Sequence, residues 1–188
     1  YSQYVNPMIG TDFTGNTYPG AQVPFGMVQL SPDNGLPGWD RISGYFYPDT
    51  TIAGFSHTHL SGTGAGDLYD ISFMPVTRPY KEAPAPLGIY STFSHNDEAA
   101  SAGYYRVLLK DYNINVELTA TERCGIQRYT FPEAEASVFL NLKKAMNWDF
   151  TLDSKIEVVD STTIRGYRLS QGWSPLQHVY FETRFSKP

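Results

Sequence analysis

Alternating apolar and polar positions are the main pattern along this chain, and they predict β-strands. The clearest case is INVELTAT (114–121), in which every second residue is apolar. An extended chain points successive side chains to opposite faces, so this segment can bury one face and expose the other. Short apolar or aromatic runs predict other strands over 23–30, 42–47, 71–76 and 136–142, and further strands are predicted over 125–131, 155–159, 163–169 and 178–185. Strands in this number, joined by turns, predict an all-β domain built as an antiparallel β-sandwich.

Helical patterns are sparse, which supports the all-β prediction. No amphipathic run is longer than about ten residues. The segment SHNDEAASAGYY (94–105) predicts one capped helical turn, with Ser94 as the N-cap, Asp97 as the acidic third position and Gly103 as the stop. The first third of the chain combines Gly, Pro and Asn with many aromatic residues. Long loops with large side chains are typical of binding faces, so this part is predicted to carry the functional surface.

Length and charge narrow the class of protein. With 188 residues, the chain is long enough for one domain with a substantial core. The net charge is −5 and no basic block is present, so binding to nucleic acid is not expected. No apolar stretch approaches the roughly 18–20 residues of a membrane span. Cys124 is the single cysteine, which excludes an intrachain disulfide, and no signal peptide opens the chain at Tyr1.

Two histidines separated by one residue, His57 and His59, are the first candidates for a functional site. On a strand both rings would point to the same side, and with Asp67 or Asp70 they could bind a metal ion. The other interpretation is one buried, hydrogen-bonded histidine and one that faces a cleft. We favour the second, because a metal would need further ligands and the two remaining histidines lie in unrelated parts of the sequence. The nearest predicted hydrogen-bond partners of the two rings are Asp67, Asp70 and Ser61.

A glycine-rich run, SGTGAG (61–66), follows the histidines. A dinucleotide-binding loop would open a helix, whereas a strand is predicted after this run, and a Walker loop would need a lysine. The phosphate interpretation is therefore weak. The alternative is a tight loop in which backbone amides, Ser61 and Thr63 closely approach a partner.

Trp39 and Asp40 come directly after the turn-forming run NGLPG (34–38). An indole can stack on the apolar face of a sugar ring, and a neighbouring carboxylate can accept hydrogen bonds from sugar hydroxyls. Equally, Trp39 could plug its own loop. The sequence leaves both interpretations open.

A complete catalytic site is not evident in the sequence. A glycosidase needs two carboxyl groups on opposite sides of a sugar, and Asp67 and Asp70 are only three residues apart. A serine nucleophile would need a Gly-x-Ser-x-Gly elbow, which is absent, and Cys124 has no evident base partner.

Several long strings, in order along nearly the whole chain, resemble glycoside hydrolase family 92. They are YVNPMIGT (4–11), NTYPGAQVPFGMVQLSPD (16–33), SGYFYPD (43–49), IAGFSHTHLSGTGAGDLYDISFMP (52–75), GYYRVLL (103–109), VELTATERCGIQRYTFP (116–132) and VYFETRFSKP (179–188). The resemblance implies an inverting, calcium-dependent exo-α-mannosidase, of α-1,2 type, that releases terminal mannose from glycans. It also implies export to the periplasm or cell surface of a bacterium.

The resemblance implies a division of labour between two domains. Residues 1–188 would be an N-terminal, supersandwich-like β-sandwich that is incomplete at its C-terminal end. A C-terminal (α/α)6 barrel would supply the acid, the base and most calcium ligands. No catalytic residue and no metal ligand is therefore expected in this chain, and the isolated fragment is expected to be inactive.

The expected partners of this chain are the barrel and α-mannoside glycans. Trp39 matches a tryptophan that lines the substrate pocket in the family. The residues expected to bind substrate are Trp39, Asp40, His57, His59, Ser61, Thr63 and Asp67. Two alternatives stay open: a stand-alone carbohydrate-binding β-sandwich, and a metal hydrolase that uses His57 and His59.

Overall fold

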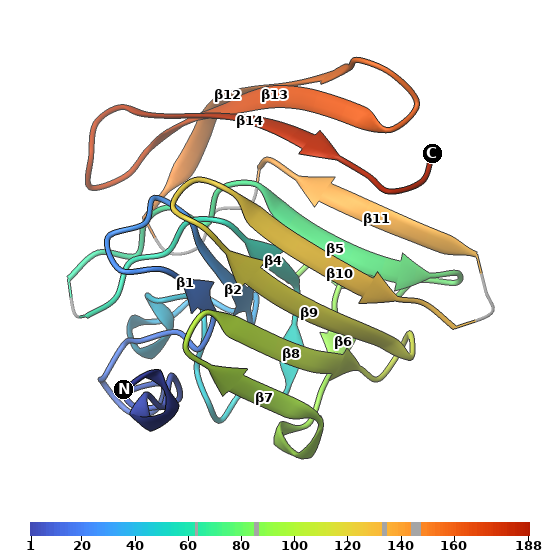
Figure 1. Ribbon diagram of the computed structural model, residues 1–188. Helices are drawn as coiled ribbons and strands as arrows, with labels where there is room; N and C mark the ends of the chain where they lie inside the picture. Colours follow the sequence, from blue (N-terminus) through green and yellow to red (C-terminus); the bar gives the residue numbers. More distant parts are fainter. Residues whose placement is uncertain (63, 85–86, 133–134, 144–147) are drawn as a thin grey trace.

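The structure is a computed structural model that describes residues 1–62, 64–84, 87–132, 135–143 and 148–188. It consists of antiparallel sheets joined by turns and loops, with short 3-10 turns as its helical elements in the described residues (Figure 1). These turns are η1 (Ser2–Tyr4), η2 (Trp39–Arg41) and η3 (His95–Asp97). None of the helices in the described residues is long and apolar enough to cross a membrane.

The described residues form three sheets and one short strand pair. The first sheet has the order β1-β2-β4-β5-β11, formed by Ala21–Gln22, Gln29–Asp33, Gly54–Ser56, Ser72–Thr77 and Ala136–Asn141. The second has the order β10-β9-β8-β7, formed by Gly125–Thr130, Ile114–Ala120, Tyr104–Leu109 and Glu98–Ser101. The third has the order β12-β13-β14, formed by Phe150–Val158, Thr163–Gln171 and Gln177–Arg184. The short pair joins β3 (Thr51–Ile52) to β6 (Ser91–Thr92).

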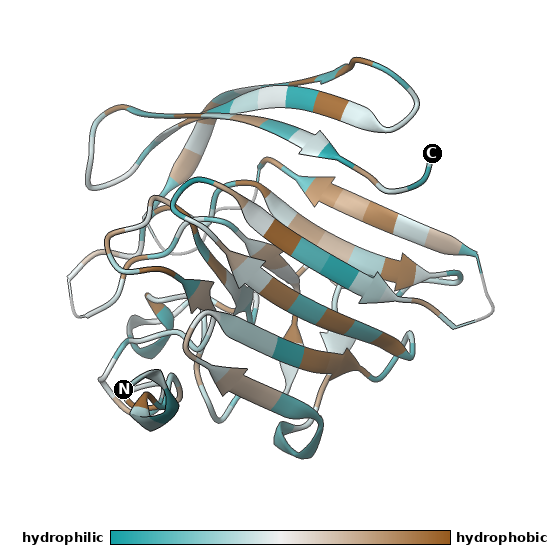
Figure 2. Cartoon of the chain, in the orientation of Figure 1, coloured by the Kyte–Doolittle hydropathy of each residue, from teal (hydrophilic) through white to brown (hydrophobic). Residues whose placement is uncertain are grey.

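The main core lies between the first and second sheets. Its members include inward-facing residues of β8 and β9, which alternate with hydrophilic ones along the strands (Figure 2). These pack against buried residues of the first sheet, among them Leu30, Phe55, Met74 and Val76. This is the half-buried pattern that the alternation in 114–121 predicts, and the all-β antiparallel sandwich is confirmed.

A second, smaller cluster covers the other face of β5 and β11. Ile71, Phe73 and Leu142 form it, and apolar side chains of β14 pack against them. Strand β5 is thus covered on both faces, which explains why Ser72 to Val76 are all buried in an uninterrupted run. In Figure 1 the third sheet accordingly forms a further layer beside β11.

Six of the nine predicted strands coincide closely with strands of the structure, and 155–159 falls largely on the end of the longer β12. The prediction over 42–47 is wrong, and the prediction over 23–30 is wrong except at its end, because β2 begins at Gln29. Phe25 is fully exposed with a positive φ, in a turn closed by Gly26 N–H donating to the Val23 carbonyl. The segment 42–47 is a turn that carries a buried tyrosine, Tyr45, into the main core.

The helical turn predicted over 94–105 is confirmed only at its start. The Ser94 hydroxyl accepts a hydrogen bond from Asn96 N–H, as an N-cap should, but the turn ends at Asp97. Residues Glu98–Ser101 pair instead with β8, and Gly103 lies in the connecting hairpin turn with φ +76°. Tertiary strand pairing therefore overrides the local helical signal.

Candidate functional site

Trp39 is presented on the short turn η2 rather than enclosed by its own loop. Its surface is 50% exposed, and its ring centroid lies 6.0 Å from that of Trp148. A hydrogen bond holds this turn in place, in which Arg41 Nε donates to Asp49 Oδ2 at 2.7 Å. Asp40, next to Trp39, is partly exposed. This end of the domain therefore offers an indole face beside a carboxylate.

His57 lies in the wall of a groove between β10 and β14. The groove has a volume of about 380 Å³, and its lining includes Phe73, Gln127 and Phe181. The Nδ1–H group of His57 donates to the Ile71 carbonyl at 2.7 Å, because a carbonyl can only accept. Its Nε2 atom lies 3.5 Å from the Gln127 amide nitrogen. The Nδ1 atom is thus fixed by a hydrogen bond within the domain, and the Nε2 atom lies beside Gln127 in the groove wall.

The imidazole of His57 is expected to be neutral at pH 7. Burial lowers its pKa from the usual value of about 6.5, and this outweighs the opposing effect of the Ile71 carbonyl. The pKa of His57 is thus lower in the folded than in the unfolded protein. The stability that the neutral buried ring contributes is therefore fully present above about pH 6.5, and it is lost as the pH falls through the folded-state pKa. Nitrogen-15 NMR of the imidazole should show the neutral Nδ1–H form at pH 7, whereas a doubly protonated ring at that pH would contradict this prediction.

His59 is enclosed by the domain, and its ring uses other partners. Its Nε2 atom lies 2.8 Å from Asp33 Oδ1 and 3.1 Å from Ser56 Oγ, and its Nδ1–H donates to the Gln29 carbonyl at 2.7 Å. The side chain has no exposed surface. A direct contact between His59 and a sugar would therefore need this part of the domain to open.

The two histidines lie in different surroundings, as the favoured interpretation predicts: His59 is buried and hydrogen-bonded, and His57 faces the groove. Strand β4 ends at Ser56, and the two rings enter separate hydrogen-bond systems. The partners predicted from the sequence, Asp67, Asp70 and Ser61, do not bond to either ring among the hydrogen bonds of the described residues. The partner of His59, Asp33, lies 26 residues away in the chain.

In the described part of the glycine-rich run, Ser61, Gly62 and Gly64 are exposed, whereas Gly66 is buried. Gly62 N–H donates to the Asn16 carbonyl at 2.7 Å. Gly62 and Gly64 both have positive φ, and a Cβ at either would meet nothing within 4 Å. Glycine is needed there for the backbone conformation and not for close packing in this domain. Thr63 lies outside the described residues.

Asp67, which follows this loop, is buried and holds the turn between β13 and β14. Its Oδ2 atom accepts from Trp173 N–H at 2.6 Å and from the Gln177 amide at 3.1 Å. Its Oδ1 atom has no hydrogen-bond partner in the structure. A Cβ on Gly172 would lie only 2.4 Å from Oδ1, so the turn can approach Asp67 this closely only because residue 172 is glycine.

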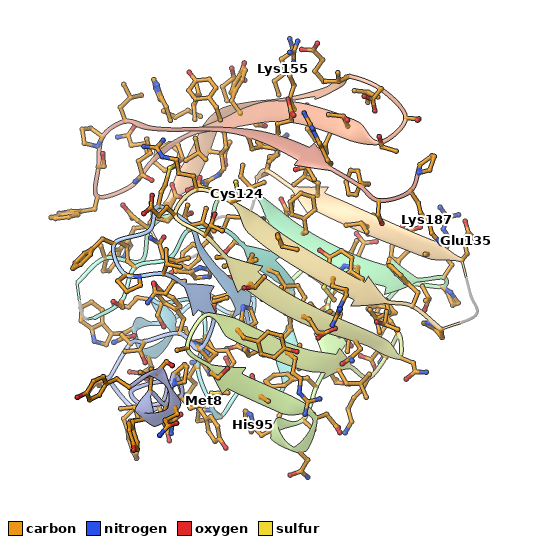
Figure 3. All side chains as sticks on the ribbon, viewed as in Figure 1. Met8, His95, Cys124, Glu135, Lys155 and Lys187 are labelled. Atoms are coloured by element: carbon orange, nitrogen blue, oxygen red, sulfur yellow. The ribbon has the colours of Figure 1, made fainter. Side chains whose placement is uncertain are left out.

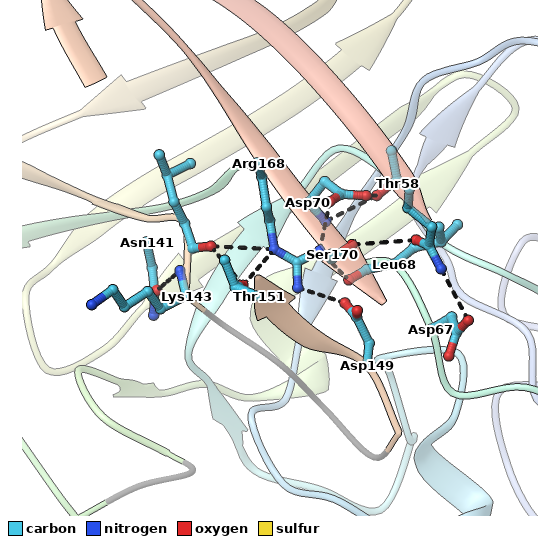
Figure 4. Close-up of polar contacts among 12 residues, drawn as sticks. Thr58, Asp67, Leu68, Asp70, Asn141, Lys143, Asp149, Thr151, Arg168 and Ser170 are labelled. Carbon is cyan, nitrogen blue, oxygen red and sulfur yellow. Dashed lines mark hydrogen bonds and ion pairs between the residues drawn. The ribbon is translucent and has the colours of Figure 1, made fainter. Parts of the chain in front are cut away.

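A buried arginine, Arg168, completes this region, and the sequence analysis missed it. It donates to Asp70 Oδ1 at 2.6 Å and to Asp149 Oδ2 at 2.5 Å, and all three side chains have no exposed surface (Figure 4). Asp70 also accepts from the Thr58 hydroxyl at 2.7 Å. Strand β13 is thereby fastened to the segment after His57. The alternating pattern of 163–169 places Arg168 on the inner face, which is the one signal that could have indicated a buried charge.

Arg168 also fastens a strained piece of backbone. Leu68, Tyr69 and Ile71 all have positive φ, which is unfavourable for residues with a Cβ. Asp70 lies among them, and its two side-chain bonds, to Arg168 and to Thr58, hold the segment in place.

Cys124 and His95 lie in different places: Cys124 lines the same groove as His57, whereas His95 does not. Cys124 is exposed on the turn between β9 and β10 (Figure 3). His95 stacks on Tyr47 at 3.8 Å between ring centroids and bonds to Glu98, at the opposite side of the view from the third sheet (Figure 3). Within the described ranges, no three His, Cys, Asp or Glu side chains are grouped so that they could hold a metal ion.

The comparison with known families decides what this fold belongs to. The family model described as the glycosyl hydrolase family 92 N-terminal domain matches residues 4–188. The chain belongs to glycosyl hydrolase family 92. The resemblance inferred from the sequence strings is thus confirmed.

Solved structures of family 92 enzymes are similar to this chain. One is the α-mannosidase BT3965 from Bacteroides thetaiotaomicron in complex with mannoimidazole, with 44% sequence identity and a TM-score of 0.93. The match covers 99% of this chain and 25% of that one. Another is the family 92 glycosyl hydrolase ccman5, with 28% identity and a TM-score of 0.85, covering 100% of this chain and 27% of that one.

A curated relative from the fungus Arthroderma benhamiae is described as an uncharacterized secreted glycosidase. It is 28% identical over 144 residues, which are 71% of this chain and 18% of the relative. The chain thus spans about a quarter of the length of these two solved family 92 structures and 18% of the length of the fungal relative.

Proposed function

We propose that this family 92 domain is the N-terminal part of an exo-α-mannosidase that removes terminal mannose from glycans with inversion of configuration. The observation that carries the proposal is the 44% identity, over 99% of the chain, to an α-mannosidase that binds mannoimidazole. We further propose that the linkage cleaved is of α-1,2 type. The secreted character of the fungal relative supports action outside the cytoplasm, in the periplasm or at the cell surface of a bacterium.

The two carboxyl groups of the reaction are proposed to come from a catalytic (α/α)6 barrel C-terminal to this domain. A general acid and a general base must both reach the sugar. Four buried carboxylates of this domain already have other tasks: Asp33 contacts His59, Asp67 holds the turn of Trp173, and Asp70 and Asp149 pair with Arg168. These engagements support a binding role for this domain rather than proton transfer.

Calcium is proposed as a cofactor of the complete enzyme, where it would help to hold and distort the sugar. The described residues do not fit a complete calcium site, since no three acidic, His or Cys side chains converge in them. The ligands are therefore proposed to lie mainly outside this chain.

The domain's own contribution is proposed to be sugar binding and docking of the barrel. Trp39 would place its exposed indole on the sugar, and Asp40 beside it would accept hydroxyl hydrogen bonds. Ser61, exposed on the glycine-rich loop, can reach a sugar or the barrel, and Thr63 is proposed to act with it. Asp67 would act by positioning the turn that carries Trp173.

The full-length enzyme is expected to hydrolyse α-mannosides, whereas residues 1–188 alone are expected to be inactive with or without calcium. The reason is that this chain is proposed to lack the acid–base pair. The measurement is mannose release from an α-linked mannobiose by both proteins, with circular dichroism as a control for folding of the fragment. A calcium-dependent activity of the fragment, abolished by a substitution within it, would contradict the proposal. Binding of mannobiose by the inactive fragment would instead favour a stand-alone carbohydrate-binding module.

A further inference from the structure

All three tryptophans of this chain keep a large part of their surface exposed. Trp39 is 50% exposed, Trp148 48% and Trp173 82%. Indole is the largest apolar side chain and is usually well buried, so three exposed indoles in one small domain call for a ligand or a partner. The function proposed above gives a task to Trp39 alone.

Trp148 and Trp173 are both attached to the polar cluster around Arg168. Trp148 precedes Asp149, which pairs with Arg168, and Trp173 donates its backbone N–H to Asp67. Figure 4 shows Asp67 and Asp149 on the same side of this cluster, beside the chain that carries Leu68. The two indoles therefore leave from neighbouring anchor points, although they are 25 residues apart in the sequence.

The residue after Trp148 and the turn around Trp173 are both held by hydrogen bonds within the domain. Asp149 is bound by a buried arginine, and the turn of Trp173 is closed by Gly172 N–H donating to the Ser174 carbonyl at 3.0 Å. A side chain that is held in this way loses less freedom on binding than one on a loose loop. Exposed aromatic groups on fixed backbone are suited to recognition rather than to packing within the domain.

The relative orientation of Trp39 and Trp148 indicates that the two indoles contact different parts of a ligand. Their ring planes are inclined by 54° with the centroids 6.0 Å apart. Two surfaces at this angle cannot both lie flat on one side of the same pyranose ring. If Trp39 covers the mannose that is removed, Trp148 faces a different part of the ligand.

We propose that Trp148 and Trp173 bind the leaving-group side of the substrate, that is, the sugar ring to which the terminal mannose is attached. This inference rests on the proposed function. The ligand class is a pyranose in a glycan, because indole faces match the apolar faces of such rings and this end of the domain also carries a partly exposed carboxylate, Asp40, which can accept hydroxyl hydrogen bonds. The two tryptophans would thus add affinity for a glycan without acting on the bond that breaks.

The test compares two substrates of the full-length enzyme that share the terminal mannose and differ in the leaving group. One is an α-linked mannobiose that the wild-type enzyme cleaves, and the other is α-mannosyl fluoride, which has no second ring. The variants Trp148→Ala and Trp173→Ala should lower kcat/KM for mannobiose at least about tenfold, as expected for the loss of a stacking surface. Their kcat/KM for the fluoride should stay within about twofold of the wild type, since no contact to the first ring is lost.

Two matched controls accompany these variants. Trp148→Phe and Trp173→Phe keep an aromatic face and should restore most of the activity on mannobiose. Tyr4→Thr removes an aromatic ring that is 78% exposed on η1, which carries none of the residues proposed to bind sugar, and should leave both substrates unaffected.

The possible results separate this inference from the proposed function. Equal losses on both substrates, together with a lower melting temperature, would show that the indoles pack against another part of the protein and would overturn the inference. So would unchanged kinetics of both alanine variants in an active enzyme. A wild-type enzyme that cleaves neither substrate would overturn the proposed function and this inference together.

Discussion

Replacing Arg168 by methionine is expected to destabilise the folded protein by about 3–5 kcal/mol. The substitution leaves Asp70 and Asp149 without exposed surface and without their shared cation. Removing one side of a buried ion pair is much more costly than removing the pair, because the remaining charges stay desolvated. The measurement is the apparent melting temperature of the full-length protein and its yield as soluble protein.

A matched control lies on the same strand, three residues away. Arg165 pairs with Glu157 at 2.8 Å on the surface, where their side chains are 55% and 45% exposed. Arg165→Met should therefore cost less than about 1 kcal/mol. A loss for Arg168→Met no larger than this control would contradict the role assigned to the buried cluster.

The loss at Arg168 should also depend on pH, with a definite sign. Burial raises the pKa of Asp149 even with Arg168 present, and removal of the cation raises it further. A carboxyl group with a raised folded-state pKa takes up a proton more readily in the folded than in the unfolded state, so stability is lost as pH rises. The deficit of Arg168→Met should thus be largest at neutral pH and shrink as the pH falls toward about 4, where the unfolded aspartate also becomes protonated.

The sandwich could be predicted from the sequence because its main core follows local alternation. In β9, the buried residues Ile114, Val116 and Leu118 are those that the period of two selects. The apolar run 23–30 forms a strand only at its end, and Met27 and Val28 both donate backbone N–H to the carbonyl of Glu122 in place of a strand partner. That contact joins residues about 95 positions apart, and no local pattern carries such information.

The candidate site was less predictable, because its geometry depends on distant partners. The sequence pairs His57 with His59, yet the His57 ring bonds to the Ile71 carbonyl and the His59 ring to the Gln29 carbonyl and to Asp33. Arg168 meets Asp70 across 98 residues, and Trp173 meets Asp67 across 106. The sequence could indicate which residues are candidates for the site, but it could not indicate the direction of each side chain or its distant partner.

The second large effect is expected on catalysis, from replacement of Trp39 by alanine in the full-length enzyme. We expect kcat/KM for α-mannosides to fall by roughly 30- to 900-fold, equivalent to about 2–4 kcal/mol of transition-state binding. The physical reason is the loss of the indole face that is proposed to orient the terminal mannose. The melting temperature should change little, because half of the ring is exposed and its nearest aromatic neighbour is itself an exposed tryptophan.

The choice of substrate makes this prediction distinct from the one for Trp148 and Trp173. Trp39 is proposed to contact the mannose that is removed, so Trp39→Ala should impair α-mannosyl fluoride and mannobiose alike, whereas the other two variants should impair mannobiose alone. Trp39→Phe serves as the control, since it keeps a flat aromatic face on η2 and should recover much of the activity. A fall of several degrees in melting temperature with unaltered kinetics would show instead that Trp39 only supports its own turn, and the sugar-binding surface would then have to be sought elsewhere on the domain.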